Sequence, residues 1–150
     1  MEKSLNHPKN MVILSIGGNL GDVESAFARA LQALEQGGFK VAKVSAPYRN
    51  PAVGCEVGAP DFLNWAVLGH WGGEPLALLD LAQAIEVAEG RPADHPHWHS
   101  RTLDIDIIEC NGVVCATPRL TLPHPRWRER DFVLVPLREI APKWLAANAI

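Results

Sequence analysis

The segment Arg101–Ile107 reads R-T-L-D-I-D-I and carries the strand pattern on which the other predictions build. Aliphatic residues at every second position alternate with Asp104 and Asp106, which is typical of a half-buried strand. Both carboxylates should therefore leave the strand on one face, roughly 6–7 Å apart at their bases. Like charges at that separation repel unless a cation lies between them, and paired oxygen ligands suit magnesium. An edge strand with solvated acidic residues is the alternative interpretation.

The composition is that of an ordinary globular domain, with 150 residues, 47% hydrophobic residues and a formal net charge of −3. It gives no indication of nucleic-acid binding, and no apolar run reaches the ~18 residues of a membrane span. Residues 1–10 are polar, so we expect a flexible N-terminal tail followed by a single domain over residues 11–150. Three cysteines without a C-x-x-C pair indicate reduced thiols and a cytoplasmic protein.

Hydrophobic periodicity predicts alternating strands and helices. The expected strands are Met11–Gly17, Phe39–Ser45 and Phe62–Gly69, and the expected helices are Val23–Gln36, which Asp22 would cap, and Pro75–Glu89. Gly17–Asp22 matches neither common phosphate-loop pattern, so we interpret it as a tight connection. Pro47–Pro60 and Gly90–Ser100 are predicted to be loops.

After the Asp pair, Asn111-Gly112 is a strong hairpin signal between Ile107-Ile108 and Val113-Val114. The apolar segment Phe132–Leu137 should close the core, and the last residues should form a tail. The order of elements predicts an α+β fold, a ferredoxin-like βαββαβ sandwich. Its mainly antiparallel sheet would carry helices on one face and an extra hairpin. The other face, bearing Asn64 and the two aspartates, would be left for ligands.

Further polar residues allow more than one interpretation. The segment Arg119–Arg130 contains four arginines and one histidine, which could be a solvated face or a positive patch for a polyphosphate–metal complex. Asn64, in an apolar strand, could be satisfied by backbone or could read the edge of a heterocycle. The three histidines at 95, 97 and 99 alternate in a loop, where a zinc site is possible but partly exposed side chains are the simpler interpretation.

Taken together, these motifs resemble the 6-hydroxymethyl-7,8-dihydropterin pyrophosphokinases of folate biosynthesis. The similarity runs from Met11 to about Pro142 and is most specific in Arg101–Ile107 and in Arg119–Leu137, R-L-T-L-P-H-P-R-W-R-E-R-D-F-V-L-V-P-L. G-G-N-L-G-D, D-F-L-N and I-E-x-x-x-G-R support it, in the order the family has them. The resemblance implies transfer of the terminal diphosphate of ATP to the hydroxymethyl oxygen of a reduced pterin, leaving AMP.

The resemblance also implies roles for individual residues. Asp104 and Asp106 would hold two Mg²⁺ ions with ATP, and Arg91 and Arg101 would close over the phosphates as catalytic residues. The nucleotide contacts would be Gln83, Glu86, Trp98, Arg119, Thr121, His124 and Arg130. The pterin contacts would be Tyr48, Asn50, Val53, Phe62, Asn64 and Phe132. We expect no tightly bound organic cofactor, no nucleic-acid or membrane partner, and a monomer or weak homodimer that binds only the small molecules ATP and pterin.

Two other functions fit parts of the sequence. The loop before Arg101 has His99-Ser100 where the family usually has Gly-Pro, and Trp65 is larger than the residue common beside the pterin asparagine. These departures would suit a paralogue that binds pterin or nucleotide but transfers weakly. A metal-dependent hydrolase that uses the three loop histidines is the third hypothesis.

Overall fold

The computed structural model describes residues 2–3, 11–51, 57–90 and 102–148. Its centre is a five-stranded antiparallel sheet in the order β3-β5-β2-β6, with β4 also paired to β5. The strands are β2 (Met11–Gly18), β3 (Lys40–Val44), β4 (Tyr48–Asn50), β5 (Phe62–His70) and β6 (Asp104–Cys110). Together with α1 (Val23–Gln36) and α2 (Pro75–Ala88), the order along the chain confirms the predicted ferredoxin-like α+β sandwich.

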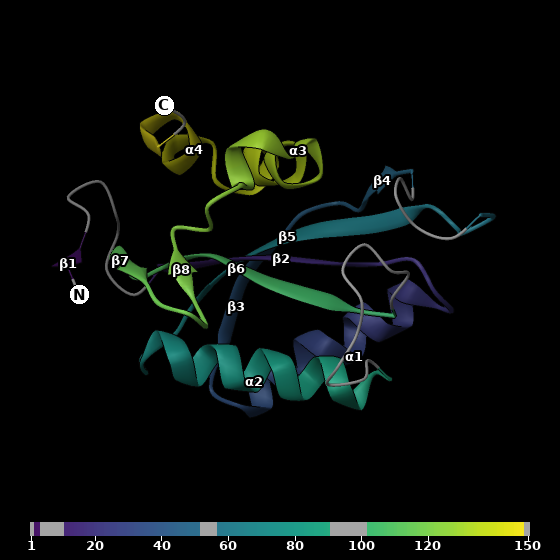
Figure 1. Cartoon of the computed structure of the whole chain (residues 1–150), viewed down its shortest axis with the longest axis horizontal. Coiled ribbons are helices and arrows are strands. Elements are labelled where there is room, and N and C mark those ends of the chain that lie inside the picture. Colours follow the sequence, from purple (N-terminus) through teal and green to yellow (C-terminus); the bar gives the residue numbers. More distant parts are fainter. Residues whose placement is uncertain (1, 4–10, 52–56, 91–101, 149–150) are drawn as a thin grey trace.

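Helices α1 and α2 cover one face of the sheet (Figure 1). The predicted cap of α1 is confirmed, because Asp22 Oδ1 accepts a hydrogen bond from the Ser25 N–H at 3.1 Å. Apolar side chains of both helices pack with the inward-facing residues of β2 and β6 in one core. Alternate residues of these strands, such as Ile13 and Ser15, therefore point to the opposite face.

The opposite face is only partly open, which corrects the prediction that this whole face is left for ligands. Helices α3 (Asp131–Ile140) and α4 (Pro142–Asn148) lie across one half of it (Figure 1). Together with the short helix η1 (Trp127–Glu129), they form a second apolar core that includes Ile13 and Ile108. The predicted apolar segment Phe132–Leu137 does close a core, as part of a helix, and the predicted C-terminal tail is wrong because α4 occupies it.

Two further predictions need correction. The long loop Pro47–Pro60 contains strand β4, which pairs with β5 through Tyr48 and Asn64. Asn111 and Gly112 do adopt the left-handed turn conformation, with φ of 54° and 71°. However, β7 (Val113–Ala116) pairs not with β6 but with β1 (Glu2–Lys3) and β8 (Thr121–Leu122) in a separate small sheet. The extra hairpin is therefore β7–β8, one strand further along the chain.

Within the described residues, no helix is long and apolar enough to cross a membrane. Strand β1 falls in the segment expected to be a flexible tail, and residues 1 and 4–10 of that segment lie outside the described part. The division at residue 11 stays a prediction.

Candidate active site

The two aspartates of β6 share one face of the sheet, as predicted. Asp104 and Asp106 are half-buried, whereas Ile105 between them is buried in the core beneath α1 and α2. Across the sheet, Asp104 pairs with Gly17 of β2 and Asp106 pairs with Ser15. Because these neighbours are small, the carboxylates lie beside a shallow part of the face that no large β2 side chain fills.

The half of this sheet face that α3 and α4 leave uncovered, which carries Asp104 and Asp106, is called the open half here. A row of three paired residues crosses it. Gly17 pairs with Asp104 on one side and with Asn64 of β5 on the other. Since adjacent strands lie about 4.8 Å apart, the Asn64 amide and the Asp104 carboxylate start about 10 Å from each other on one face. A Cβ at Gly17 would overlap the Asn64 side chain, so this position requires glycine. The sequence analysis missed Gly17, although a glycine at the end of a buried strand is a signal of such an approach.

The predicted pterin contacts gather around Asn64. Its side chain is 6% exposed, and its Nδ2 donates a short hydrogen bond to Asn50 Oδ1. Strand β4 places Tyr48 opposite Asn64 and Asn50 opposite Phe62. The structure thus brings four of the six predicted pterin contacts onto two neighbouring strands.

Trp65 follows Asn64 in the chain but lies in the other core. Its ring stacks on that of Phe27 from α1, with centroids 4.1 Å apart and planes 3° from parallel. Side chains alternate along a strand, so Trp65 and Asn64 point to opposite faces. The large residue at this position therefore leaves the space beside Asn64 unobstructed.

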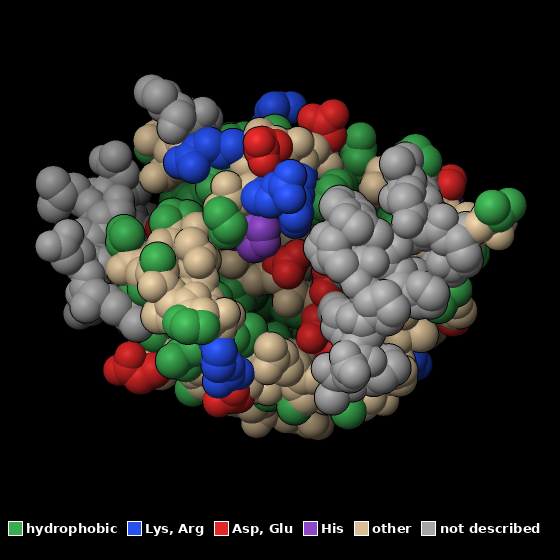
Figure 2. Space-filling view, viewed as in Figure 1, with side chains coloured by type: hydrophobic (Ala, Val, Ile, Leu, Met, Phe, Trp, Pro, Cys, Tyr) green, Lys and Arg blue, Asp and Glu red, His purple; other side chains and the backbone are tan. Residues whose placement is uncertain are grey.

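The basic side of the site begins at Arg130, just before α3. Arg130 Nη1 lies 4.0 Å from Asp106 Oδ2, and the two side chains are only 22% and 32% exposed. The guanidinium carbon of Arg130 also lies 5.5 Å from the ring centroid of Phe132. Arg130 therefore lies close to both Asp106, a predicted metal ligand, and Phe132, a predicted pterin contact. Figure 2, which views the molecule along the sheet with α3 and α4 above and α1 and α2 below, shows acidic, basic and histidine side chains around a hollow between these helices.

His124 lies in this basic region with a defined hydrogen-bonding pattern. Its backbone N–H donates to Ile108 O at 2.9 Å, and its Nδ1 accepts from the Arg126 N–H at 3.2 Å. Burial and the nearby charge of Arg130 lower the pKa of the imidazole to about 4, against an opposing effect of Asp104. The ring is therefore neutral near pH 7, and with Nδ1 as acceptor its proton is on Nε2, free to donate to a phosphate oxygen.

Arg119 and Gln83, both predicted nucleotide contacts, touch each other. Arg119 Nη2 lies 3.1 Å from Gln83 Oε1 and 2.7 Å from Asp80 Oδ1. Thr121 is exposed on β8, two residues further along. Asp80 is a second residue that the sequence analysis missed, and its spacing of three from Gln83 on α2 was the available signal. A phosphate that binds Arg119 must compete with its carboxylate.

Glu86 is placed differently from the other predicted nucleotide contacts. It is 8% exposed, and its Oε2 accepts a hydrogen bond of 2.7 Å from the backbone N–H of Ile105. This contact joins α2 to the peptide between the two aspartates.

Several predicted residues lie outside the described part of the chain, namely Val53, Arg91, Trp98 and Arg101, together with the three loop histidines at 95, 97 and 99. Within the described part, no group of three or more His, Cys, Asp or Glu side chains is placed to hold a metal ion. The cation site at Asp104 and Asp106 stays a prediction. With two protein carboxylates, such a site would need further oxygen atoms from a substrate or from water, as magnesium in phosphate-transfer sites does.

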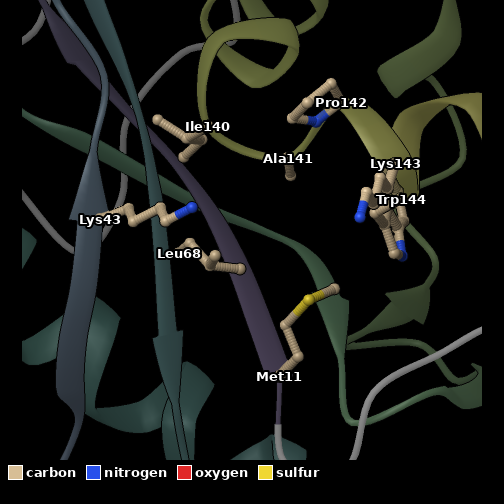
Figure 3. Close-up of a pocket in the computed structure, with 8 residues that line it drawn as sticks. All are labelled: Met11, Lys43, Leu68, Ile140, Ala141, Pro142, Lys143 and Trp144. Atoms are coloured by element: carbon tan, nitrogen blue, oxygen red, sulfur yellow. The ribbon is translucent and has the colours of Figure 1, made fainter.

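A cavity of about 410 Å³ lies elsewhere, between β2, β5 and the junction of α3 with α4 (Figure 3). It is lined by Met11, Lys43, Leu68, Ile140, Ala141, Pro142, Lys143 and Trp144. Met11 and Gly17 stand at opposite ends of β2, so the cavity is about 20 Å along the strand from the row containing Asp104. None of the predicted site residues lines it.

The model of the 7,8-dihydro-6-hydroxymethylpterin-pyrophosphokinase family matches residues 13–142, which contain the whole site. The chain belongs to this family. It is 41% identical over 132 residues to the 2-amino-4-hydroxy-6-hydroxymethyldihydropteridine pyrophosphokinase of Bacillus subtilis, covering 87% of this chain and 78% of that relative. The enzyme of the same name from Methylorubrum extorquens is 41% identical over 130 residues, 86% of this chain and 81% of the relative. The enzyme of the same name from Porphyromonas gingivalis is 37% identical over 143 residues, which cover 93% of this chain and 95% of the relative.

Proposed function

We propose that this pyrophosphokinase transfers the terminal diphosphate of ATP to the hydroxymethyl group of 6-hydroxymethyl-7,8-dihydropterin, giving AMP, in folate biosynthesis. Family membership makes the chain an ATP-dependent transferase that needs a divalent metal. The observation that carries the specific proposal is the row Asn64–Gly17–Asp104, which sets an amide and an acidic pair on one open face.

In this proposal the pterin binds at the β4–β5 side of the row. Asn64 reads the polar edge of the heterocycle, and Asn50 fixes the orientation of its amide through their hydrogen bond. Phe132 offers an apolar ring for stacking. Tyr48, Val53 and Phe62 complete the pocket. The separation of about 10 Å between Asn64 and Asp104 leaves room for the bicyclic ring between the amide and the phosphates.

The phosphates of ATP bind at the β6 side. Asp104 and Asp106 would hold two Mg²⁺ ions, which when bound neutralise the charge of the phosphate oxygens. Their half-buried position and small neighbours fit this role, because oxygen atoms of a substrate can reach them. Arg130 and the neutral His124 donate hydrogen bonds to phosphate oxygens, and Arg119, Gln83 and Thr121 bind the remainder of the nucleotide.

The reaction needs positioning and charge neutralisation rather than a protein nucleophile. The hydroxymethyl oxygen attacks the β-phosphorus of ATP, the bond from that phosphorus to the α,β-bridging oxygen breaks, and AMP leaves. The alcohol proton passes to solvent. Arg91 and Arg101 are proposed to stabilise the charge that develops on the transferred group.

The direct test is to incubate the protein with ATP, Mg²⁺ and 6-hydroxymethyl-7,8-dihydropterin and to separate the nucleotides by chromatography. We expect stoichiometric AMP and diphosphorylated pterin, and no AMP when the pterin is omitted. Absence of AMP with any reduced pterin would contradict the proposal. Tight binding of both substrates without turnover would instead support the weakly transferring paralogue.

A further inference from the structure

Helix α2 contacts the acid-bearing strand through a buried carboxylate. Glu86 is 8% exposed, and its Oε2 lies 2.7 Å from the backbone nitrogen of Ile105. A buried hydrogen bond from a backbone N–H to a carboxylate oxygen is shielded from water, which strengthens it. The contact is thus a firm connection between α2 and one peptide of β6.

That peptide is the one that joins the two proposed metal ligands. The N–H of Ile105 belongs to the peptide bond that follows Asp104, and Asp106 comes next along the strand. Strand β6 is at the edge of the five-stranded sheet, where β2 is its neighbour on one side. Outward-facing N–H groups of an edge strand have no ladder partner, so the Glu86 carboxylate supplies a hydrogen bond that the sheet does not. Rotation of this peptide would change the direction of Asp104 relative to Asp106.

The end of α2 fastens the same stretch of chain at a second point. Thr102 Oγ1 donates to the backbone oxygen of Glu89 at 2.6 Å. Glu89 is itself held by Arg29 of α1, whose Nη2 lies 2.7 Å from Glu89 Oε1. One contact from α2 at Glu86 and one from the residue that caps it, Glu89, therefore hold the two ends of the segment 102–105, at the point where β6 begins.

We infer that Glu86 is a positioning residue, whose carboxylate fixes the Asp104–Ile105 peptide so that both aspartates face one metal-binding space. This inference rests on the proposed function. It assigns the Glu86 oxygen to the backbone of β6 instead of to the nucleotide. It agrees with the absence, within the described residues, of a third acidic side chain placed with the pair to hold a metal.

The test separates the hydrogen-bond acceptor from the charge. Glu86→Gln keeps an oxygen that can accept from Ile105, whereas Glu86→Leu removes it. We expect kcat/KM of the glutamine variant to stay within about threefold of the unchanged protein. The leucine variant should need more Mg²⁺ for half-maximal rate and lose about 10–100-fold in kcat/KM, the usual effect of removing support from a metal ligand. Its affinity for metal-free ATP should be unchanged.

The chain offers a matched control at the other edge of the sheet. Glu35 Oε1 of α1 accepts a hydrogen bond of 2.8 Å from the backbone N–H of Val41 in β3. Glu35→Leu removes the same kind of contact far from the Asp pair, so it should leave kcat and the Mg²⁺ dependence unchanged. Equal losses in the Glu35 and Glu86 variants would mean that the effect is general destabilisation, and would overturn the inference.

A measurement that does not depend on turnover is hydrogen exchange of the Ile105 amide, followed by NMR. We expect protection in the unchanged protein and in Glu86→Gln, and fast exchange in Glu86→Leu. If the leucine variant does not fold, Glu86→Ala replaces it, with the same expected result. An equal loss of activity in Glu86→Gln and Glu86→Leu, or a loss of metal-free ATP binding, would assign Glu86 to the nucleotide and overturn the inference.

The outcomes distinguish this inference from the proposed function. If the unchanged protein forms no AMP and its ATP binding does not depend on Mg²⁺, the proposed function fails. If the unchanged protein is active and Mg²⁺-dependent but Glu86→Leu behaves normally, only the role of Glu86 fails.

Discussion

The sheet face opposite α1 and α2 has two halves that differ in what covers them. In one half, Ile13 and Ile108 lie beneath α3 and α4 in an apolar core. In the other, Ser15 and Gly17 continue the same face of β2, and half-buried Asp104 and Asp106 stand where apolar residues would otherwise be. The same pair of strands thus changes from core to site within a few residues, because its side chains become small or acidic toward the start of α3.

Substitutions in the open half should have the largest effect on activity. Replacing Asp104 or Asp106 by alanine should lower kcat by about 1000-fold, because each is a proposed ligand of the metal that neutralises the phosphates. The melting temperature should not fall, because neither side chain fills core volume. AMP formation and thermal unfolding measure the two effects, with Glu24→Gln on the exposed side of α1 as a control. A variant with a near-normal rate would show that the pair does not hold the metal.

In the half covered by α3 and α4, a substitution should lower stability and leave kcat nearly unchanged. Leu137 is fully buried in the core between α3 and the sheet. Leu137→Ala should lower the free energy of unfolding by about 2–5 kcal/mol through lost burial and a residual cavity. Under conditions where the variant stays folded, its kcat should be close to that of the unchanged protein. A large fall in kcat with little loss of stability would mean that α3 serves the site more than the core.

Each half contains one titratable group with a shifted pKa, Glu109 in the covered half and His124 in the open half, so stability should depend on pH. Burial raises the pKa of Glu109 to about 7, against smaller opposing effects of the Trp144 indole and a backbone N–H. Between its ordinary pKa and 7 the folded state binds more protons than the unfolded state, so stability falls as pH rises. His124, with its pKa lowered to about 4, has the opposite sign, because the unfolded state binds more protons up to about pH 6.5.

Glu109→Gln should separate these two contributions in the metal-free protein. The unchanged protein should show little pH dependence between pH 5 and 6.5, because the two groups offset each other. The free energy of unfolding of the variant should rise with pH over this range. The variant should also lack the decrease of about 3 kcal/mol that Glu109 causes as the pH rises from its ordinary pKa to about 7. Urea unfolding at several pH values is the measurement. Identical pH profiles for the two proteins would show that Glu109 titrates normally.

The smallest effect on activity should come from the exposed residues Asp80 and Arg119 at the border of the open half. Asp80 and Arg119 form an exposed ion pair, with 64% and 50% of their side chains accessible. Asp80→Asn should free Arg119 for the nucleotide and lower KM for ATP by about two- to threefold, in proportion to the small worth of surface pairs. Titration of ATP at fixed Mg²⁺ measures it. A rise in KM would mean that Asp80 orients Arg119 instead of competing for it.

The fold could be predicted in segments whose apolar residues follow a clear helical or strand periodicity. The amphipathic spacing of Val23–Gln36 with Asp22 before it predicted α1 with its bounds, and the alternation around Asp104 and Asp106 predicted their common face. Both patterns are local, so no tertiary information was needed.

The covered half could not be predicted in the same way. Phe132–Leu137 is a short apolar run with two valines and a proline, and its helical period becomes visible only when Ile140 is included. The turn at Asn111-Gly112 was recognised, but the partners of β7 were not. They are β8, which follows it, and β1, which lies at the other end of the chain. Gly17 and Asp80 were missed because their roles come from neighbours distant in the chain, namely Asn64 across the sheet and Arg119 between β7 and β8.

The most direct test of the account is a crystal structure of the protein with Mg²⁺, a non-hydrolysable ATP analogue and the reduced pterin. We expect metal ions bound by both Asp104 and Asp106, phosphate oxygens within hydrogen-bonding distance of His124 and Arg130, and the pterin edge against Asn64. Phosphates bound in the covered half or at the cavity near Lys143, with the two carboxylates out of contact with metal, would contradict it.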